Sequence, residues 1–365
     1  MAAYTTIDDP ELYFQTVIYT GNGSTQSITL PGSEDMAPDY VRIKNRDTTD
    51  SNLHFDSPRG ATLYWESQDN NKGSNATDAD TLTSFDSDGF SLGADDKVNT
   101  NTEKYVAWCW KGGTTSGIDT TGVEITPSAY SFNQTSGFSV IKYTGSGIAG
   151  DEVSHGLNAI PEFMVVRLAE DGGTGDHVRS YNKWQQATPE LNYIGYNYTW
   201  GTQDAGNLPY AVWHDEAVTS VHFSIGTDGA INTTGDVHSG LFWTSKQGFS
   251  KLGIYYGNGN ADGPFVYCGL RPAFIKIKQM STDGEHWLMY DNKRDTYNPS
   301  DTVLYSDGTA TEATIGTSLD IDILSNGFKI RNTDANTNES GESYFFMAMA
   351  EAPFVNSNGV PCNAR

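Results

Sequence analysis

The stretch FQTVIYTG at residues 14–21 decides the fold, because close variants of it return twice further along the chain. FSVIKYTG occupies residues 138–145, and FSKLGIYYG occupies residues 249–257. Each copy begins with Phe, passes through aliphatic and aromatic residues, and ends in Tyr, one further residue and Gly. Copies spaced by about 110–125 residues indicate an internal duplication.

A second marker returns at nearly the same intervals. Pro38, Pro161 and Pro272 are each followed by one variable residue, an aromatic residue and an aliphatic residue, as PDYV, PEFM and PAFI. Because both markers keep nearly the same offsets, the 365-residue chain is predicted to contain three related units. Each unit is of ordinary domain size and can bury a core of its own.

The markers divide the chain into an arm and three units. Residues 1–12 form an N-terminal arm, residues 13–126 the first unit with a Gly/Thr-rich linker, residues 127–246 the second unit, and residues 247–365 the third unit with a C-terminal tail. Asp9-Pro10 within the arm predicts one helical turn. We interpret the arm as an attachment element; the alternative is a segment that packs on the first unit.

Composition predicts strands and tight turns. The chain has 38 Gly, 20 Tyr, 16 Phe and 8 Trp, and no 12-residue window carries the apolar spacing of a long amphipathic helix. The fold class expected is all-β, with three tandem β-sandwich repeat domains of the concanavalin or jelly-roll type. RPAFIKIK at residues 271–278 alternates like a half-buried strand. Three such units in a row predict an elongated chain.

Charge excludes some partners. The net charge is −24, from 22 Lys and Arg against 46 Asp and Glu, so phosphate-rich nucleic acid and anionic membranes should repel the chain. No stretch is apolar enough for membrane insertion, and the first residues lack the features of a secretion signal. Cys109, Cys268 and Cys362 are too few and too scattered for a disulfide framework, and we expect Cys109 and Cys268 to be buried.

His54, His177 and His286 are predicted to hold equivalent positions in the three units. A catalytic histidine needs a positioned nucleophile or acid, and none of the familiar catalytic motifs accompanies these residues. We therefore favour structural roles for them, and we keep His177 as a candidate for ligand contact.

The carboxylates of Asp86 and Asp88 precede Gly89 and are weak candidates for a calcium site. Asp before Gly is also ordinary turn chemistry, and this stretch lacks the third acid and the distal Glu of an EF-hand loop. We favour solvated turns and expect no cofactor, with calcium left open.

Four tryptophans lie in or beside loop-like stretches and are candidates for exposed sugar-stacking surfaces. They are Trp65, Trp184, Trp200 and Trp213. Sugar rings pack against such side chains, which combine an apolar face with a polar tip. Unit two carries an insertion between His177 and Phe223, so Trp184, Trp200 and Trp213 mark the place where we expect a recognition surface. The alternative is that these rings belong to the sandwich core.

Several phrases of the chain resemble one family closely. They are YTTIDDPELYFQTVIYTGNGSTQSITLPGSEDMAPDYVRIKNRD, LTSFDSDGFSLG, YVAWCWKGG, GFSKLGIYYGNGNADGPFVYCGLRPAFIKIK, ILSNGFKIR and SYFFMAMAEAPF. Together they are similar to repeat-containing virion structural proteins, labelled as tail-fibre-like, of tailed bacteriophages that infect marine bacteria and cyanobacteria. SGLFWTSK, at the end of unit two, departs from the family pattern. The resemblance implies a virion component with concanavalin-like repeats, and it brings no catalytic residues with it.

These observations predict a non-enzymatic bacteriophage structural protein, a tail fibre or tail adaptor that contacts host surface glycan. It would be assembled in the host cytoplasm and bind other virion proteins. We expect a homo-oligomer, with a trimer as the candidate state. Two alternatives remain open: a capsid decoration protein on the head surface, and a virion enzyme that degrades glycan. Neither nucleic acid nor a membrane is expected as a partner.

Overall fold

The computed structural model describes residues 4–67, 76–170, 178–204, 212–314 and 318–363. Strands joined by turns and irregular loops make up nearly all of this part of the chain. Its three α-helices, α1 (Asp96–Asn99), α2 (Gly229–Asn232) and α3 (Ala335–Asn338), have four residues each. The prediction of an all-β fold built from sandwich units is confirmed.

Unit one pairs a six-stranded antiparallel sheet with a three-stranded one. The larger sheet has the order β1 (Phe14–Thr20), β9 (Lys104–Trp110), β3 (Tyr40–Asn45), β4 (Leu53–Asp56), β5 (Leu63–Glu66) and β6 (Ala76–Thr77). The smaller sheet has the order β2 (Gln26–Ile28), β8 (Gly89–Leu92) and β7 (Leu82–Asp86). The one-turn helix η1 (Pro10–Leu12) precedes β1, with Asp9 as its N-cap, as the sequence predicts.

Unit two has the same central order with an additional edge strand. Its larger sheet runs β10 (Ala129–Asn133), β11 (Phe138–Thr144), β18 (Val237–Trp243), β13 (Phe163–Glu170), β14 (Arg179–Asn182), β15 (Asn192–Gly195) and β16 (Gln203–Asp204). β12 (Glu152–Ser154) and β17 (His222–Ser224) form its smaller sheet. The one-turn helix η2 (Pro189–Leu191) leads into β15.

Unit three repeats the arrangement of unit one. Its larger sheet runs β19 (Ser250–Tyr256), β27 (Ser343–Pro353), β21 (Leu270–Gln279), β22 (Leu288–Asp291), β23 (Thr302–Tyr305) and β24 (Ala313–Thr314). Its smaller sheet runs β20 (Phe265–Tyr267), β26 (Gly327–Ile330) and β25 (Ile321–Leu324). In all three units the recurring first strand therefore pairs with the last long strand of the unit, which closes each unit upon itself.

The structure explains why the recurring strand ends in Tyr, one further residue and Gly. The Tyr hydroxyl donates to a carbonyl of the one-turn helix in each unit: Tyr19 to Val98, Tyr143 to Ile231 and Tyr255 to Thr337. The Gly lies against the end of the same helix. A Cβ would stand 2.1, 2.4 and 2.2 Å from a carbonyl oxygen at Gly21, Gly145 and Gly257, so only Gly fits this close approach.

A buried asparagine completes this junction and is a repeated element that the sequence markers did not include. Asn99, Asn232 and Asn338 end the three helices and are at most 1% exposed. Each Oδ1 accepts a backbone N–H from the turn after the first strand, at 2.9, 2.9 and 2.8 Å. Each side chain thus satisfies backbone groups that burial would otherwise leave unpaired.

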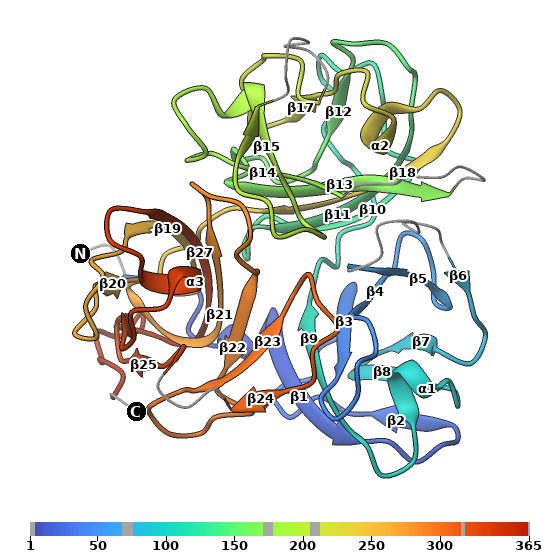
Figure 1. Ribbon diagram of the computed structural model, residues 1–365. Helices are drawn as coiled ribbons and strands as arrows, with labels where there is room; N and C mark the ends of the chain where they lie inside the picture. The colour runs from blue at the N-terminus through green and yellow to red at the C-terminus, as the bar shows by residue number, and fades with distance from the viewer. Residues whose placement is uncertain (1–3, 68–75, 171–177, 205–211, 315–317, 364–365) are drawn as a thin grey trace.

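The three units share one core. Figure 1 shows them arranged around a common centre, with the larger sheets turned toward one another. The aromatic residues that follow the marker prolines meet there. Tyr40 lies 6.2 Å from Phe138 and 6.3 Å from Trp243 of unit two, and Phe274 lies 5.9 Å from Trp110 of unit one. The second sequence marker therefore supplies contacts between units.

The predicted elongated chain is wrong, and so is the half-buried strand. In β21, Ile275 and Ile277 face the core inside unit three, while Phe274, Lys276 and Lys278 are also at most 3% exposed. The alternation of apolar and polar residues does not separate core from solvent. It separates the core of one unit from the interface with the others, because both faces of the larger sheet are covered.

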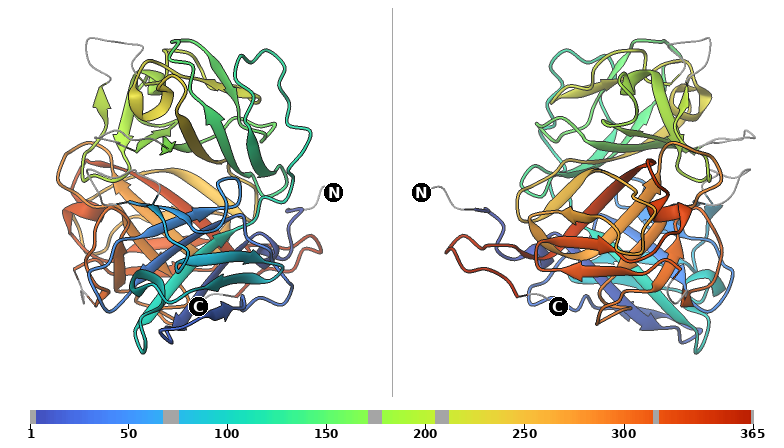
Figure 2. Two further views of the ribbon diagram at one scale, coloured as in Figure 1. Left: turned by 90° about the vertical axis from the view of Figure 1, so that its right-hand side faces the viewer. Right: turned by 60° about the vertical axis from the view of Figure 1, so that its left-hand side comes forward.

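The arm lies between the first and third units. Ile7 is 3% exposed and belongs to the shared core, and the Thr5 hydroxyl donates to the carbonyl of Gln247 at 2.7 Å. The backbone N–H of Ser357 in the tail donates to the Asp8 carboxylate at 2.7 Å. Figure 2 shows the arm and the tail projecting from the same side of the molecule. The described part of the arm thus closes the ring of three units.

The shared core predicts that the units unfold together. Trp110 is 4% exposed and contacts Trp243 of unit two and Phe274 of unit three. Trp110→Ala should cost roughly 3–5 kcal/mol of the free energy of unfolding and shift a single calorimetric transition. Ile18→Ala, in the same unit but at a side chain 44% exposed, is the control and should change little. A variant with separate transitions, only one of them shifted, would contradict the shared core.

Candidate functional site

The insertion of unit two lies along the seam with unit three. Its strand β15 leads to Gly195, whose carbonyl accepts the indole N–H of Trp287 at 3.3 Å. Further on, the backbone N–H of Thr202 donates to the carbonyl of Met280 at 2.6 Å. The described part of the insertion therefore packs against unit three.

A groove of about 510 Å³ opens at this seam. Its walls combine two aromatic rings with amide and hydroxyl groups: Trp184, Tyr256, Gln186, Thr202, Ser281 and Ser343. Ile254 and Met280 supply apolar surface between them. The groove is large enough for a small organic ligand, and it draws on residues of two units.

The two aromatic rings are held in different ways. Trp184 is partly buried and packs at 6.3 Å from Phe345 of unit three, with the Lys183 ammonium 5.0 Å from its ring centroid. Tyr256 ends β19 and is 62% exposed, because the alternation of that strand turns Tyr255 inward. A fixed indole and an accessible phenol form the kind of surface on which sugar rings stack.

The polar residues of the groove are neutral. The hydroxyls of Ser281 and Ser343 lie 3.3 Å apart, and Gln186 is exposed at the rim. The described residues that line the groove include no carboxylate and no histidine. These groups can donate and accept hydrogen bonds to hydroxyls, but they hold neither an acid nor a base for hydrolysis.

The other aromatic candidates have different surroundings. Trp213 is 2% exposed and packs against Tyr181 and Phe223 in the core of unit two, and Trp65 is 1% exposed. The expectation that these two rings are exposed is wrong. The stretch that carries Trp213 folds over the core of unit two, whereas Trp65 lies in strand β5 and points into the core that the three units share. Trp200 is partly buried and stacks on Tyr198 at 4.1 Å. His177 lies outside the described residues.

The predicted equivalence of the histidines is also wrong. Strand register places His54 opposite Arg42, and the position opposite the equivalent Lys276 is Met289, whereas His286 precedes β22. His54 is fully buried. Its Nδ1 is hydrogen-bonded to the Tyr40 hydroxyl at 2.6 Å, and its ring stacks on Trp65 with the ring centroids 3.7 Å apart. Burial, followed by the nearby Arg42, holds the pKa of His54 well below its usual range.

His286 lies in a different environment. Its Nδ1 is 3.1 Å from the Asp307 carboxylate, and its ring stacks on Tyr305 at 4.1 Å. The hydrogen bond to Asp307 raises the pKa of His286. Of the three candidate histidines, the two that lie in the described residues, His54 and His286, thus have structural partners, and those partners differ.

The calcium candidates lie in a hairpin turn between β7 and β8. The Asp86 carboxylate accepts hydrogen bonds from the hydroxyls of Ser84 and Ser91, each at 2.7 Å, and Asp88 accepts the backbone N–H of Met36 at 3.2 Å. Gly89 follows at φ +112°, a conformation that favours glycine. In the described ranges, no three His, Cys, Asp or Glu side chains are grouped to hold a metal ion.

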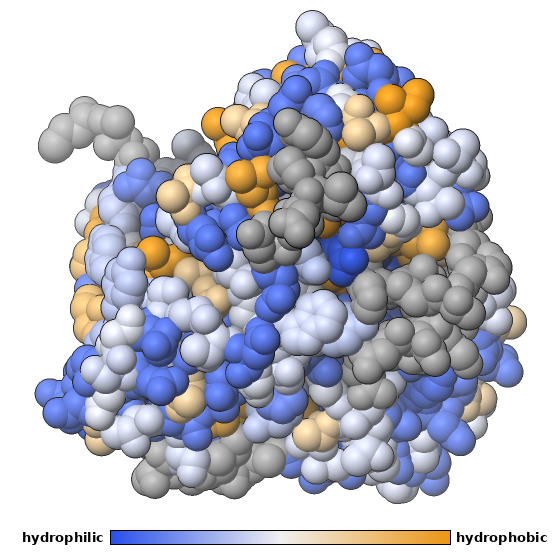
Figure 3. All heavy atoms as spheres, turned by 45° about the horizontal axis from the view of Figure 1, so that its top comes forward, coloured by the Kyte–Doolittle hydropathy of each residue, from blue (hydrophilic) through white to orange (hydrophobic). Residues whose placement is uncertain are grey.

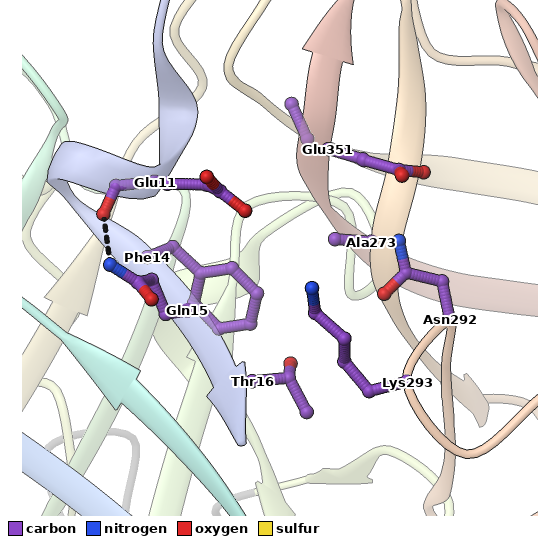
Figure 4. A pocket seen from close by; sticks show the side chains of 9 residues that line it. Glu11, Phe14, Gln15, Thr16, Ala273, Asn292, Lys293 and Glu351 are labelled. Carbon is purple, nitrogen blue, oxygen red and sulfur yellow. Dashed lines mark hydrogen bonds between the residues drawn. The ribbon is translucent and has the colours of Figure 1, made fainter. Parts of the chain in front are cut away.

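A second, much smaller cavity of about 20 Å³ lies between the arm, β1 and unit three. Figure 4 shows the Lys293 side chain extending toward Glu11, Thr16 and Glu351 at this place. The Glu11 carbonyl accepts a hydrogen bond from Gln15 at 2.9 Å, which fixes the helical turn above the cavity. The volume suits a water molecule, so this cavity is too small for an organic substrate.

The visible surface of the molecule in Figure 3 is mainly hydrophilic, like the polar lining of the groove. In Figure 3, apolar residues of the visible face form small separate patches within a hydrophilic surface. No helix of the described residues combines the length and apolarity needed to span a membrane.

Cys109 and Cys268 are buried, as predicted, and burial raises the pKa of both thiols.

Comparison with protein families gives one match. The family model named Domain of unknown function (DUF7483) matches residues 9–353. The chain belongs to the DUF7483 family. The match spans all three units, so the DUF7483 domain corresponds to the whole ring and not to one sandwich. Neither the curated proteins nor the solved structures that were compared contain a match.

Buried histidines predict a loss of stability in acid. The His155 Nδ1 accepts the backbone N–H of Leu157 at 3.2 Å, and burial lowers the pKa of His155 to about 4. Since the unfolded chain binds a proton near pH 6.5 and the folded one does not, stability falls as pH drops from 6.5 toward 4. The full shift corresponds to roughly 3 kcal/mol.

Urea unfolding at pH 7 and pH 4.5 measures this loss. His155→Asn should reduce the difference in the free energy of unfolding between the two pH values. His286→Asn is a control of opposite sign: the raised pKa of His286 gives stability that is present below pH 6.5 and lost as pH rises through that pKa. An unchanged pH dependence in His155→Asn would contradict the assignment.

Proposed function

We propose that this DUF7483 protein is a non-enzymatic structural protein of a bacteriophage virion that contacts host surface glycan through the seam groove. The observation that carries the binding part is the groove itself, where Trp184 and Tyr256 come together with neutral hydroxyl and amide groups. Aromatic stacking combined with hydrogen bonds to neutral groups is well suited to uncharged sugar units. The virion part rests on the resemblance of the sequence phrases quoted above.

The architecture supports binding over catalysis. Three related units retain the same strand order, and the buried groups that they share, a Tyr, a Gly and an Asn at each helix, hold backbone in place. Glycoside hydrolysis commonly uses two carboxylates across a cleft, and the described lining of the groove supplies none. A scaffold role with one recognition groove therefore accounts for more of the structure than a hydrolase does.

A sugar-binding measurement tests the groove. Trp184→Ala and Tyr256→Ala should each weaken binding to bacterial surface polysaccharide about tenfold or more, as measured by biolayer interferometry across a panel of purified polysaccharides. Tyr297→Ala is the matched control, because Tyr297 is 83% exposed in the same unit and does not line the groove. Wild-type affinity in both groove variants would refute the proposed site, and release of reducing sugar by the wild-type protein would favour a glycan-degrading enzyme.

The compact ring favours a location in the virion other than a fibre shaft. A tail fibre built from repeats is expected to be long, whereas these three units close around one centre. This shape suits a tail adaptor or a decoration protein of the head surface more directly than a fibre shaft.

Antibody labelling of intact particles separates these locations. A tail adaptor predicts label at the tail in electron micrographs, and a decoration protein predicts label over the head. Label over the head alone would exclude the tail fibre and the tail adaptor together, while the groove variants test glycan binding independently of location.

A further inference from the structure

Three basic side chains are buried where the units meet. Arg42 of β3, Arg167 of β13 and Lys276 of β21 are 2%, 2% and 3% exposed. Arg42 and Lys276 hold equivalent positions, each two residues after the aromatic residue that follows a marker proline. Buried cations are normally paired with carboxylates, because removing an isolated charge from water is costly. In a chain with a net charge of −24, acids are plentiful, so the composition of this centre requires an explanation.

The hydrogen-bond partners of Arg42 are neutral. Its guanidinium donates to the hydroxyl and the carbonyl of Ser306, each at 2.8 Å, to the Asn52 side chain at 3.3 Å and to the Ser67 hydroxyl at 3.5 Å. With the Tyr196 hydroxyl as the fifth acceptor, every N–H of Arg42 has a partner, but none of these partners carries a charge. In the part of the chain that the structure describes, no ion pair joins a carboxylate to Arg42 or to Lys276. Asp307 is the carboxylate that raises the pKa of Lys276, but its hydrogen bonds are with His286 and the backbone N–H of Trp287.

Tyr196, from the insertion of unit two, collects donors at this centre. Its hydroxyl oxygen accepts hydrogen bonds from Arg42, at 3.2 Å, and from Lys276. With both lone pairs used in this way, the hydroxyl proton of Tyr196 is directed elsewhere. No second hydrogen bond from the Lys276 ammonium to an oxygen or nitrogen atom is seen among the described residues. Its other contacts are the faces of the Tyr196 and Trp287 rings, whose centroids lie 4.2 and 5.4 Å away. The donors of this centre that have no oxygen or nitrogen acceptor are therefore those of Lys276 and Tyr196.

A small cavity lies beside these donors. It measures about 10 Å³ and is lined by Arg42, Lys276 and Tyr196 together with the rings of Tyr40, Phe163 and Trp243. We name it the central chamber. This is the space of about one water molecule, which excludes phosphate, sulfate and organic anions and leaves room only for a monatomic ion or water.

We propose that the central chamber binds one halide ion, chloride in physiological solution, held by the Lys276 ammonium and the Tyr196 hydroxyl and facing the Arg42 guanidinium. The ion supplies an acceptor for the Lys276 ammonium and the Tyr196 hydroxyl, and it places a negative charge beside Arg42 and Lys276. Because Arg42, Tyr196 and Lys276 come from units one, two and three, the ion joins all three units at their centre.

The rival arrangement is a chamber with a neutral Lys276 amine. Burial and the adjacent Arg42 both lower the pKa of Lys276, and a neutral amine could accept the Tyr196 hydroxyl proton. That arrangement would leave Arg42 without a counter-charge and would make stability indifferent to halide. The two arrangements differ in what occupies the chamber and in how stability responds to chloride.

Bromide in crystals distinguishes them directly. Crystals grown in sodium bromide should show one anomalous scattering peak in the central chamber, within hydrogen-bonding distance of Lys276 Nζ and the Tyr196 hydroxyl. This measurement uses the wild-type chain and needs no variant. A chamber without a bromide peak would overturn the proposal.

Chloride-dependent stability supplies the second test. Replacing sodium gluconate by sodium chloride at constant ionic strength should raise Tm by roughly 4 °C per hundredfold increase in chloride once the site is saturated. Lys276→Met and Tyr196→Phe should each abolish this rise, so either variant suffices if the other fails to fold. Lys251→Met, at an exposed lysine of β19, is the matched control and should retain it. Equal chloride dependence in the wild type and in the chamber variants would overturn the proposal.

Discussion

Both faces of each larger sheet carry side chains that must leave water, and the remaining architecture depends on this constraint. One face packs on the smaller sheet of its own unit, as Ile275 and Ile277 do in unit three. The other face carries Phe274 or its counterparts Tyr40 and Phe163, and only the neighbouring units can cover it. Three sheets arranged around one centre cover each other completely, so the stable body is the ring and not the single sandwich. The family match across residues 9–353 has the same extent.

Sequence markers located the repeated strands because strand ends are fixed by local chemistry. The Gly that ends each first strand is required by a carbonyl oxygen that leaves no room for a Cβ, so the duplication had to keep it. Such markers could not predict how the three units are arranged relative to one another. Alternation in RPAFIKIK is the same whether its polar face meets water or another unit, and only the three-dimensional neighbours decide between them. The histidines show a different error. His54 and His286 have similar offsets within their units, but in the strand register His286 lies three residues before the position equivalent to His54.

The sequence predicted one of the two aromatic rings of the groove and missed the other. Trp184 was identified by its place in the insertion, because loops that differ between repeats are free to acquire a specific role. Tyr256 was missed, since it belongs to the recurring strand that was taken as scaffold, although its position beside the inward Tyr255 marks it as outward-facing. Trp213 misled for the converse reason: a ring in an irregular stretch can still fill a core when the loop folds back. Where two units contribute to one site, a search within each repeat finds only one wall.

Two sets of equivalent positions at the centre differ between the three copies. The position after β5, β15 and β23 is Ser67, Tyr196 and Ser306, and the position two residues after the marker aromatic is Arg42, Val165 and Lys276. Three identical copies would place three equal charges around the axis, and their mutual repulsion in a dry interior would be severe. Val165 stands where a third cation would otherwise complete this set of equivalent positions, which lowers that repulsion. Tyr196 stands where the other units have Ser, and its single phenol accepts hydrogen bonds from Arg42 and Lys276. The symmetric scaffold thus contains an asymmetric polar centre, which a single chain of three units can encode and a trimer of identical chains cannot.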